Sequence, residues 1–597
     1  MCGILGTYDI KGIDESLVKS QLDITKFRGP DSSDFYIKNN IALGSNRLSI
    51  RDLTENGKMP LKSICDNYII VFNGEIYNSS FLKKDLLNSG YKFRGKSDTE
   101  VLLNLYIKHK NKCLKYLSGM FSFCIYNKKE NLFFIARDRT GEKPFYYYSK
   151  SGTFTFSSQL NQLLLDPKIN KKIDRKSLFY YLENGYSPND SSLIKDVKKL
   201  ESGHSLTFKI SSEEIIIDKY WDITNQKEDY VLDEQEIIDN VDSLLNSSVK
   251  ETLVSDVSVG VLLSGGIDSS LISYYSSINK TNINTFNVSF DGFSKYDESE
   301  QALKVAKFLG TNHHEFNGNS IKYDLIELLA HNIGEPIADS SLLATYMVYN
   351  EIGKKSKVVL GGDGGDELFG GYSNYKLSHD YENKNKYFKA IAQKLPIGTP
   401  GKNKYLKTNS NGLLAYKYFN AIDIHKLFNF DFYSKVKESN LQLPDDFLKS
   451  VTLEDFKNYL TEDILVKIDR ASMMNSIESR SPFLNKNLIE FAFNRIPSSF
   501  KIVEGNKKII LKKLLKQKVG VKFDFDKKQG FSIPLDNWAK NGWYNSFKDD
   551  INNLPDGFNK DYILKMLFSL KLGFKNSNNL FAIIILSKWM NKHSITL

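Results

Sequence analysis

The chain has 597 residues, too many for a single hydrophobic core, so we expect two or more domains. Hydrophobic residues make up 41% of it and charged residues 25%, the balance of an ordinary globular protein. The net charge of +10 is spread over lysine-rich stretches such as residues 507–516, with no concentrated basic stripe interleaved with aromatic residues, which excludes a nucleic-acid partner.

Neither end of the sequence predicts membrane targeting. The N-terminus lacks a basic start followed by a long apolar segment, and the apolar run at residues 580–586 is far shorter than the ~20 residues of a membrane span. The four cysteines show no metal-ligand spacing and, without a secretory signal, do not indicate a disulfide framework; they are Cys2, Cys65, Cys113 and Cys124. We therefore expect a cytoplasmic protein without a membrane partner.

Cys2 is the first residue with distinctive chemistry. A small residue after the initiator methionine permits removal of the methionine, which leaves a free α-amino group on the cysteine. Such an amine has a pKa of ~7.7–8 and can take the thiol proton near neutral pH, so nucleophile and base lie on one residue. A cysteine at position 2 usually has no such role, so the interpretation of Cys2 as a nucleophile depends on the motifs that accompany it.

Several polar residues follow at the ends of predicted elements. Arg47 lies in an apolar context and could bind a carboxylate through two N–H groups. The predicted strand at residues 68–72 leads into Asn73 and Gly74, whose amide and backbone N–H could form an oxyanion hole. Asp98, at the start of a predicted helix, is either a helix cap or the binding group for a substrate ammonium.

Taken in order, these motifs resemble those of the class II glutamine amidotransferases. They are CGI at residues 2–4, RGPD at 28–31, NRLSI at 46–50, NGEIYN at 73–78, SDTE at 97–100 and RDRTGEKP at 137–144. The resemblance implies an N-terminal-nucleophile domain, a four-layer αββα sandwich, over residues 1–210. It also implies that Cys2 attacks the glutamine amide, that Arg47 binds the α-carboxylate and Asp98 and Glu75 the α-amino group, and that Asn73 and Gly74 stabilise the oxyanion.

A second domain is predicted at residues 234–597. Residues 211–233 mix β-forming and polar residues, and we interpret them as the closing edge of the first domain followed by a linker. From residue 234 apolar residues recur at helical spacing. Predicted strands at 259–263, 283–290, 312–316 and 357–360 alternate with predicted helices at 297–309, 320–332 and 341–353, and the last third is mostly helical. This alternation predicts a doubly wound parallel sheet with ligands at the carboxyl ends of its strands, which would place Val288 near a nucleotide base.

The loop after the first of these strands predicts a phosphate site. Its glycine N–H groups, its serine hydroxyls and the start of the next helix converge on one point, which suits an anion. Asp268 beside a phosphate suggests a bridging Mg²⁺. Because the Gly-Lys-Ser/Thr ending of the ordinary P-loop is missing, we predict the SGGxDS type, which binds the pyrophosphate leaving ATP. A serine-rich turn without a ligand is the alternative.

Two acidic segments follow later in the chain. Residues 361–372 contain six glycines and three acids directly after a predicted strand, which indicates a ligand loop; a simple metal loop or a flexible tip is the alternative. Glu335, Asp339 and Ser340 offer acids and a hydroxyl suited to the ammonium of an amino acid.

From about residue 235 almost to its end, the chain resembles the synthetase domain of glutamine-hydrolysing asparagine synthetases. The resemblance implies ATP as a substrate, Mg²⁺ held by Asp268 and Asp366, Lys508 beside the α-phosphate, and a possible homodimer. The implied ATP and pyrophosphate contacts are Leu263, Ser264, Gly265, Gly266, Asp268, Ser269, Ser270, Val288 and Gly362.

The implied reaction is attack of a carboxylate on the ATP α-phosphate, followed by displacement of AMP by ammonia from the first domain. Asp363, in GDGGDE, stands where the best-known asparagine synthetases have glutamate in GEGSDE, a residue thought to assist ammonia attack. The acceptor is therefore aspartate or, alternatively, another carboxylate such as a surface-polysaccharide uronate. An inactive protein that senses glutamine or nucleotide is the alternative of another class.

Overall fold

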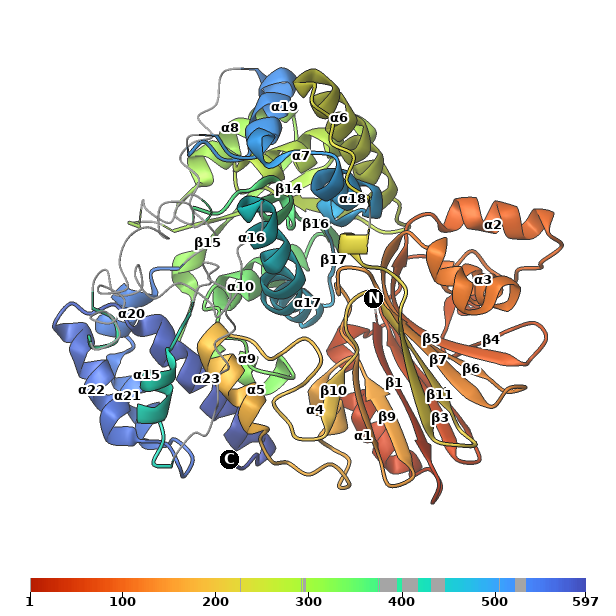
Figure 1. Cartoon of the computed structure of the whole chain (residues 1–597), viewed down its shortest axis with the longest axis horizontal. Helices are drawn as coiled ribbons and strands as arrows, with labels where there is room; N and C mark the ends of the chain where they lie inside the picture. Colours follow the sequence, from red (N-terminus) through yellow and green to blue (C-terminus); the bar gives the residue numbers. More distant parts are fainter. Residues whose placement is uncertain are drawn as a thin grey trace.

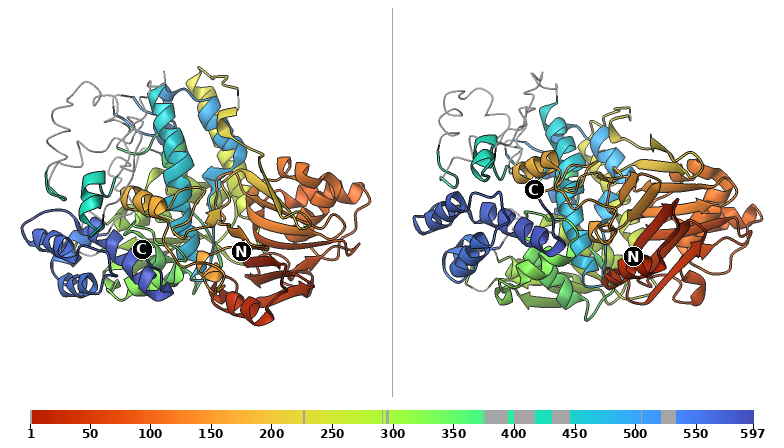
Figure 2. Two further views of the ribbon diagram at one scale, coloured as in Figure 1. Left: turned by 60° about the horizontal axis from the view of Figure 1, so that its bottom comes forward. Right: turned by 90° about the horizontal axis from the view of Figure 1, so that it is seen from below.

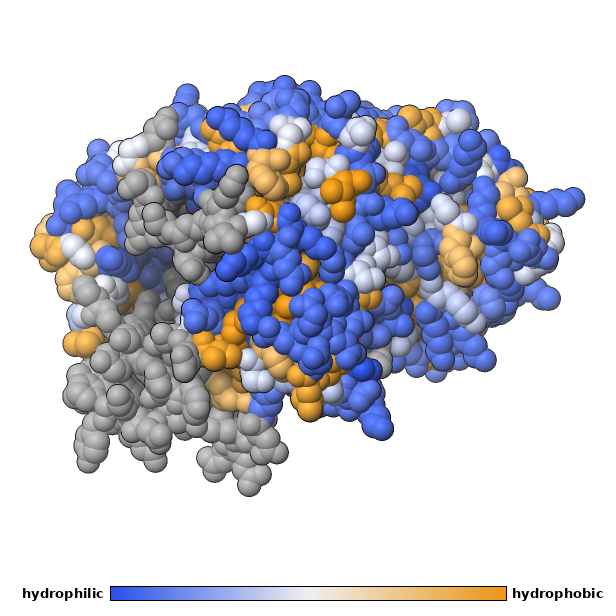
Figure 3. All heavy atoms as spheres, turned by 90° about the horizontal axis from the view of Figure 1, so that it is seen from above, coloured by the Kyte–Doolittle hydropathy of each residue, from blue (hydrophilic) through white to orange (hydrophobic). Residues whose placement is uncertain are grey.

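The computed structural model describes residues 2–225, 227–290, 292–293, 297–373, 375, 395–399, 417–430, 446–503, 505–520 and 533–597. The N-terminal sheets lie at one end of the molecule and the last helices at the other, with a parallel sheet between them (Figures 1 and 2). The surface seen from above is mostly hydrophilic, with hydrophobic residues in small separate groups (Figure 3).

Two six-stranded antiparallel sheets form the first domain, in the orders β10-β8-β9-β1-β3-β2 and β12-β11-β7-β6-β5-β4. The strands of the first sheet are β1 (Cys2–Asp9), β2 (Ser32–Lys38), β3 (Ile41–Arg47), β8 (Tyr146–Lys150), β9 (Thr153–Ser157) and β10 (Val197–Lys199). Those of the second sheet are β4 (Leu61–Lys62), β5 (Tyr68–Ile76), β6 (Gly119–Asn127), β7 (Leu132–Arg137), β11 (His204–Lys209) and β12 (Glu214–Lys219).

Helices cover the outer faces of these two sheets. The helix α1 (Glu15–Asp23) packs Val18 and Leu22 on Leu5 and Ala42 of the first sheet, while α3 (Asp98–His109) packs on β5. The inner faces share one core, so the predicted αββα sandwich is confirmed. The other helical segments are η1 (Lys26–Arg28), η2 (Glu55–Gly57), α2 (Ser79–Asn88), η3 (Lys110–Lys115), α4 (Leu160–Leu163) and α5 (Arg175–Asn184).

The segment predicted as a linker begins with a strand. β12 pairs antiparallel with β11, so the second sheet extends beyond residue 210. A short turn, η4 (Ile223–Asn225), then leads to α6 (Glu234–Thr252), which starts where the helical pattern begins because the Asp233 side chain accepts a hydrogen bond from Glu236 N–H.

A five-stranded parallel sheet in the order β15-β14-β13-β16-β17 organises the second domain, which confirms the doubly wound prediction. Its strands are β13 (Val259–Leu262), β14 (Asn284–Ser289), β15 (Asn312–Asn317), β16 (Val358–Leu360) and β17 (Glu478–Arg480). Val261 and Leu360 face the core beneath α6 and α7, whereas Val288 and Val359 face the core beneath α9 and α10. The strand β17 was not predicted, because three polar residues between two helices carry no apolar pattern.

The remaining elements are mostly helical. Around the sheet lie α7 (Ile267–Asn279), α8 (Ser299–Leu309), η5 (Gly318–Ser320), α9 (Leu325–Asn332), α10 (Leu342–Ile352) and α11 (Gly365–Phe369). Then follow α15 (Ala421–Lys426), α16 (Phe447–Asp455), the π-helix η6 (Phe456–Ile464), α17 (Leu465–Met473), η7 (Pro482–Leu484), α18 (Lys486–Asn494), η8 (Ser498–Phe500) and α19 (Ile509–Val519). The last helices are α20 (Leu535–Lys540), α21 (Tyr544–Asn552), α22 (Lys560–Lys571) and α23 (Ser577–His593).

The apolar run at residues 580–586 lies in α23 and is fully buried in the core of the second domain. Within the described residues, every helix is too short or too polar to cross a membrane.

Candidate active sites

Cys2 lies in a small cavity where the two sheets of the first domain meet. The lining includes the predicted residues Cys2, Arg47, Gly74, Glu75 and Asp98. Asn73, on β5, is tied to the nucleophile because its Oδ1 accepts a hydrogen bond from Cys2 N–H at 3.0 Å. Its buried Nδ2 has no hydrogen-bond partner among the described residues, so this donor is available to a ligand. Burial raises the pKa of the Cys2 thiol, and the positive charge of Arg47 opposes that shift.

Neighbouring backbone fixes the two groups predicted to bind the ends of glutamine. Arg47 Nη2 donates to the carbonyls of Arg51 at 3.1 Å and Asp52 at 2.6 Å. Asp98 is not the helix cap, since Ser97 Oγ accepts from Glu100 N–H in that role. Instead Asp98 Oδ2 accepts from Ile76 N–H at 2.9 Å, which holds the carboxylate at the end of β5.

A glycine is required at position 74. A Cβ atom there would lie 2.1 Å from the carbonyl oxygen of Met120 on the paired strand β6. Such an overlap would force the strands apart beside the nucleophile, so the close approach of β5 and β6 sets the shape of the cavity.

Glu75 lies between two arginines from different domains. Arg51 Nη1 is 3.0 Å from Oε1, and Arg480 Nη2, on β17, is 3.3 Å from Oε2. Burial and the negative charge of Asp98 raise the pKa of Glu75 to about 8, against the opposing charges of both arginines. Neither arginine was predicted as a site residue, and neither was Glu478, which also lines this cavity.

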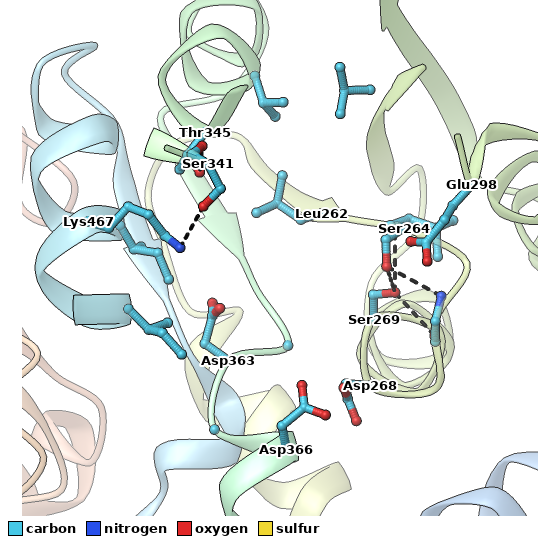
Figure 4. Close-up of a pocket in the computed structure, with 18 of the residues that line it drawn as sticks. Leu262, Ser264, Asp268, Ser269, Glu298, Ser341, Thr345, Asp363, Asp366 and Lys467 are labelled. Carbon is cyan, nitrogen blue, oxygen red and sulfur yellow. Dashed lines mark hydrogen bonds between the residues drawn. The ribbon is translucent and has the colours of Figure 1, made fainter. Parts of the chain in front are cut away.

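A second cavity, of about 520 Å³, opens at the carboxyl ends of β13, β14 and β16. Of the predicted residues it brings together Leu263, Ser264, Gly266, Asp268, Ser269, Val288, Asp339, Gly362, Asp363 and Asp366. Figure 4 shows Ser264 and Ser269 on one side, Lys467 with Ser341 on the other, and the three aspartates Asp268, Asp363 and Asp366 along the edge between them.

Hydrogen bonds within the serine-rich loop fix its conformation. Ser269 Oγ accepts from Ser264 N–H at 3.2 Å and lies 3.1 Å from Ser264 Oγ. Gly265 has a φ of +77°, the left-handed region that favours glycine, and a Cβ there would lie 2.8 Å from the backbone nitrogen of Ala302. Gly265 and Ser270 belong to this junction without lining the cavity; the buried Ser270 hydroxyl has no partner in the described part of the chain.

Lys508 joins the two predicted metal ligands. Its Nζ contacts Asp268 Oδ2 and lies 2.6 Å from Asp366 Oδ1, although Lys508 lies outside the lining of the cavity. The glycine-rich loop must approach closely, because Cβ atoms at Gly362 and Gly365 would lie 2.9 Å and 2.7 Å from atoms of Asp268. Two carboxylates that already converge on one cationic group fit a hard divalent cation, which prefers oxygen ligands.

The opposite wall carries a charged pair that the sequence did not reveal. Lys467 Nζ, on α17, lies 2.5 Å from Asp339 Oδ2 and 2.9 Å from Ser341 Oγ. Burial alone would raise the pKa of Asp339, but the charge of Lys467 and its hydrogen bond lower it. Burial raises the pKa of Asp363 to about 6, with Lys467 opposing.

Two predicted acceptor-binding residues, Glu335 and Ser340, lie outside the lining of this cavity and make their hydrogen bonds elsewhere. The Glu335 carboxylate accepts hydrogen bonds from Tyr146 O–H at 3.2 Å, Ser187 O–H at 2.7 Å and Leu193 N–H at 2.5 Å, all in the first domain. Ser340 Oγ donates to Asn578 Oδ1 at 2.9 Å. The turn after Gly334 aims Glu335 at the domain interface, so of the predicted trio only Asp339 lines the cavity.

The fold and the two cavities define a glutamine amidotransferase domain joined to a parallel-sheet synthetase domain. The family model for the glutamine amidotransferase domain matches residues 1–221, and the asparagine synthase model matches residues 240–591. The chain belongs to the asparagine synthase family, which uses ATP as a substrate.

Its relatives include asparagine synthetase [glutamine-hydrolyzing] 1 of Bacillus subtilis, 31% identical over 100% of this chain and 97% of the relative. Putative asparagine synthetase [glutamine-hydrolyzing] 2 of Methanocaldococcus jannaschii is 34% identical over 79% of this chain and 98% of its own length.

Proposed function

We propose that this chain makes asparagine from aspartate, glutamine and ATP, and releases glutamate, AMP and pyrophosphate. The observation that carries the proposal is that one chain holds both a cysteine cavity with a free amide donor and an aspartate-rich cavity at the end of a parallel sheet.

Glutamine hydrolysis uses the first cavity. Once Met1 is removed, the α-amine of Cys2 takes the thiol proton, and Cys2 Sγ attacks the glutamine amide carbon. Asn73 Nδ2 and Gly74 N–H stabilise the oxyanion that forms. Arg47 binds the α-carboxylate, and Glu75 with Asp98 bind the α-ammonium. Breaking the C–N bond releases ammonia and leaves a thioester, which water hydrolyses to glutamate.

Adenylation uses the second cavity. A carboxylate oxygen of the acceptor attacks the α-phosphorus of ATP, and pyrophosphate leaves toward Ser264, Gly266 and Ser269. Asp268 and Asp366 would hold Mg²⁺, which offsets phosphate charge when bound. Among the described residues, no group of three or more histidine, cysteine, aspartate or glutamate side chains is arranged to hold a metal ion by itself. Lys508 adds positive charge beside the α-phosphate.

Amide formation follows in the same cavity. Ammonia reaches the acyl-adenylate through the interior without being protonated, attacks the acyl carbon, and AMP leaves. Asp363 takes the proton that the attacking nitrogen loses, and its raised pKa makes it a better base than an ordinary aspartate.

Aspartate is the acceptor that the charged wall favours. Lys467 offers a cation for an α-carboxylate, and Asp339 beside it offers an anion for an α-ammonium. A sugar uronate has no ammonium and would leave Asp339 without a substrate contact.

The test is mass spectrometry of a reaction with amide-¹⁵N-glutamine, ATP, Mg²⁺ and aspartate. We expect labelled asparagine in step with AMP. If AMP forms with a sugar uronate and not with aspartate, the acceptor is the uronate. If neither glutamate nor AMP forms, the chain is an inactive sensing protein.

A further inference from the structure

The short strand β17 lies between the two cavities and sends a side chain toward each. Successive side chains of a strand point to opposite faces. Glu478 lines the Cys2 cavity, and Arg480 reaches Glu75 on the same side. Ser479 points the other way, where its Oγ lies 2.9 Å from the hydroxyl of Tyr349, which lines the second cavity.

The backbone of β17 also supports the acidic loop. Leu360 on β16 is in register with Arg480, and the next residue, Gly361, donates its N–H to the Arg480 carbonyl at 2.9 Å. Gly361 begins the loop that carries Asp363 and Asp366. A shift of this loop when nucleotide binds would therefore move the backbone from which the Arg480 side chain extends.

Arg480 is held by hydrogen bonds within the second domain, whereas its contact with the first domain is a longer ion pair. Its Nη1 donates to the carbonyls of Thr252 at 2.6 Å and Val254 at 2.7 Å, and its Nε to Glu478 Oε1 at 2.7 Å. The buried Nη2 makes an ion pair with Glu75 at 3.3 Å but no aligned hydrogen bond among the described residues. Among these contacts of Arg480, this ion pair with the first domain therefore has room to tighten.

Charge makes the contact important for Glu75. That carboxylate is buried beside Asp98 and near Glu478, and the positive charges of Arg480 and Arg51 oppose these negative charges. Without Arg480, Glu75 would more readily take up a proton and lose its attraction for an ammonium.

We propose that Arg480 is a positioning residue for glutamine hydrolysis, which holds the Glu75 carboxylate in place for the glutamine α-ammonium, favours its ionised form, and links it through β17 to the loop of the ATP cavity. The proposal rests on the proposed function only in assigning glutamine to the Cys2 cavity. It adds a route by which the synthetase domain controls glutamine binding.

The first test measures glutamate release without ATP, an assay that does not depend on the identity of the acceptor. For Arg480→Gln we expect the KM for glutamine to rise at least tenfold with a smaller change in kcat. The ratio of the variant's KM to the wild-type KM should decrease as the pH increases from 7 to 9, because higher pH deprotonates Glu75 in both proteins. Arg495→Gln, which removes a half-exposed arginine paired with the exposed Asp229, is the matched control and should leave KM unchanged.

An unchanged KM in an active Arg480→Gln variant would overturn the proposal. If that variant also loses AMP formation from added ammonium, Arg480→Lys, which keeps the positive charge, decides: with ammonia-dependent activity intact, a KM for glutamine close to that of wild type supports the role of this charge beside Glu75, whereas a KM as high as that of Arg480→Gln refutes it. An inactive wild type would instead count against the proposed function.

A second test addresses the link to the ATP cavity. Ser479→Ala removes the contact with Tyr349 without touching Glu75. We expect ATP, Mg²⁺ and aspartate to change the wild-type KM for glutamine, and Ser479→Ala to reduce that change at least twofold while leaving the KM without ATP unaltered. A wild-type KM that does not respond to ATP would refute this link.

Discussion

At the scale of single residues, the two proposed chemistries should be separable, because no described residue lines both cavities. Cys2→Ala should abolish synthesis from glutamine and leave synthesis from added ammonium salts within about twofold of wild type, since the adenylating residues lie in another domain. AMP formation with each nitrogen source is the measurement. Loss of ammonia-dependent AMP formation as well would contradict two separate sites.

Asn73 has two tasks that only an amide can combine, because its Oδ1 accepts from Cys2 N–H and its Nδ2 remains available. Asn73→Ala should lower the kcat of glutamate release by about 10²–10³-fold, the usual effect of losing one oxyanion donor. The KM for glutamine should change much less. A variant with a raised KM for glutamine and an unchanged kcat would instead assign Asn73 to binding of the substrate ground state.

Asp363 should give amide formation a pH dependence of its own. Burial raises its pKa to about 6, so the base is ionised above that pH and protonated below it. Asparagine formation from added ammonia, measured from pH 5 to 8 at constant free ammonia, should fall below about pH 6. Pyrophosphate exchange should not share this acidic limb, because adenylation precedes the proton transfer. Identical profiles for the two steps would remove Asp363 from that role.

At the scale of elements, the glycine-rich loop works by close approach. A Cβ at position 365 would lie 2.7 Å from Asp268 Oδ1, so Gly365→Ala should displace Asp268 and lower pyrophosphate release at least tenfold. Glutaminase activity without ATP serves as the internal control and should remain. Ser373→Ala, outside the cavity lining, is a matched surface change expected to have little effect.

The same scale shows why part of the site was predictable. Ser264, Asp268 and Asp366 follow strands of one parallel sheet, and such strand ends meet at one edge whatever the side-chain packing. Arg480 and Lys467 were missed as site residues because their importance depends on which neighbour they contact across the fold. The place of Glu335 was missed for the same reason: it is close to Asp339 in sequence, but its carboxylate contacts residues of the first domain whereas Asp339 lines the second cavity.

At the scale of the whole molecule, buried ion pairs join the domains. Arg28 of the first domain donates to both carboxylate oxygens of Asp469 on α17, at 2.8 Å and 3.1 Å. Lys199 and Glu462 form a second buried pair across the same boundary. Because breaking one partner of a buried pair leaves an uncompensated charge, Asp469→Asn should destabilise the protein by about 3–5 kcal/mol.

The pH dependence of this interface follows from Asp469. Burial works against its charge, but Arg28, Lys143 and Arg470 together lower its pKa to about 2 from an ordinary value of 3.8. A lowered pKa contributes stability above about pH 4, which is lost as the pH falls toward 2. Thermal unfolding of wild type and Asp469→Asn between pH 7 and 2 should therefore converge at the acidic end. Curves that stay parallel would exclude this source of stability.

Burial of Cys2 sets an order of events during synthesis. Cys2 is 5% exposed, its carbonyl accepts from Arg28, and Glu478 of the second domain closes the same cavity. If Met1 is removed, as the proposed function requires, the aminopeptidase must act before those later residues have folded. At ~5–20 residues per second, the ribosome needs roughly 25–95 s to pass from position 2 to position 480. Met1 would thus have to be removed from the nascent chain within this period. A purification tag should be placed at the C-terminal end, because an N-terminal tag would leave Cys2 without a free α-amine.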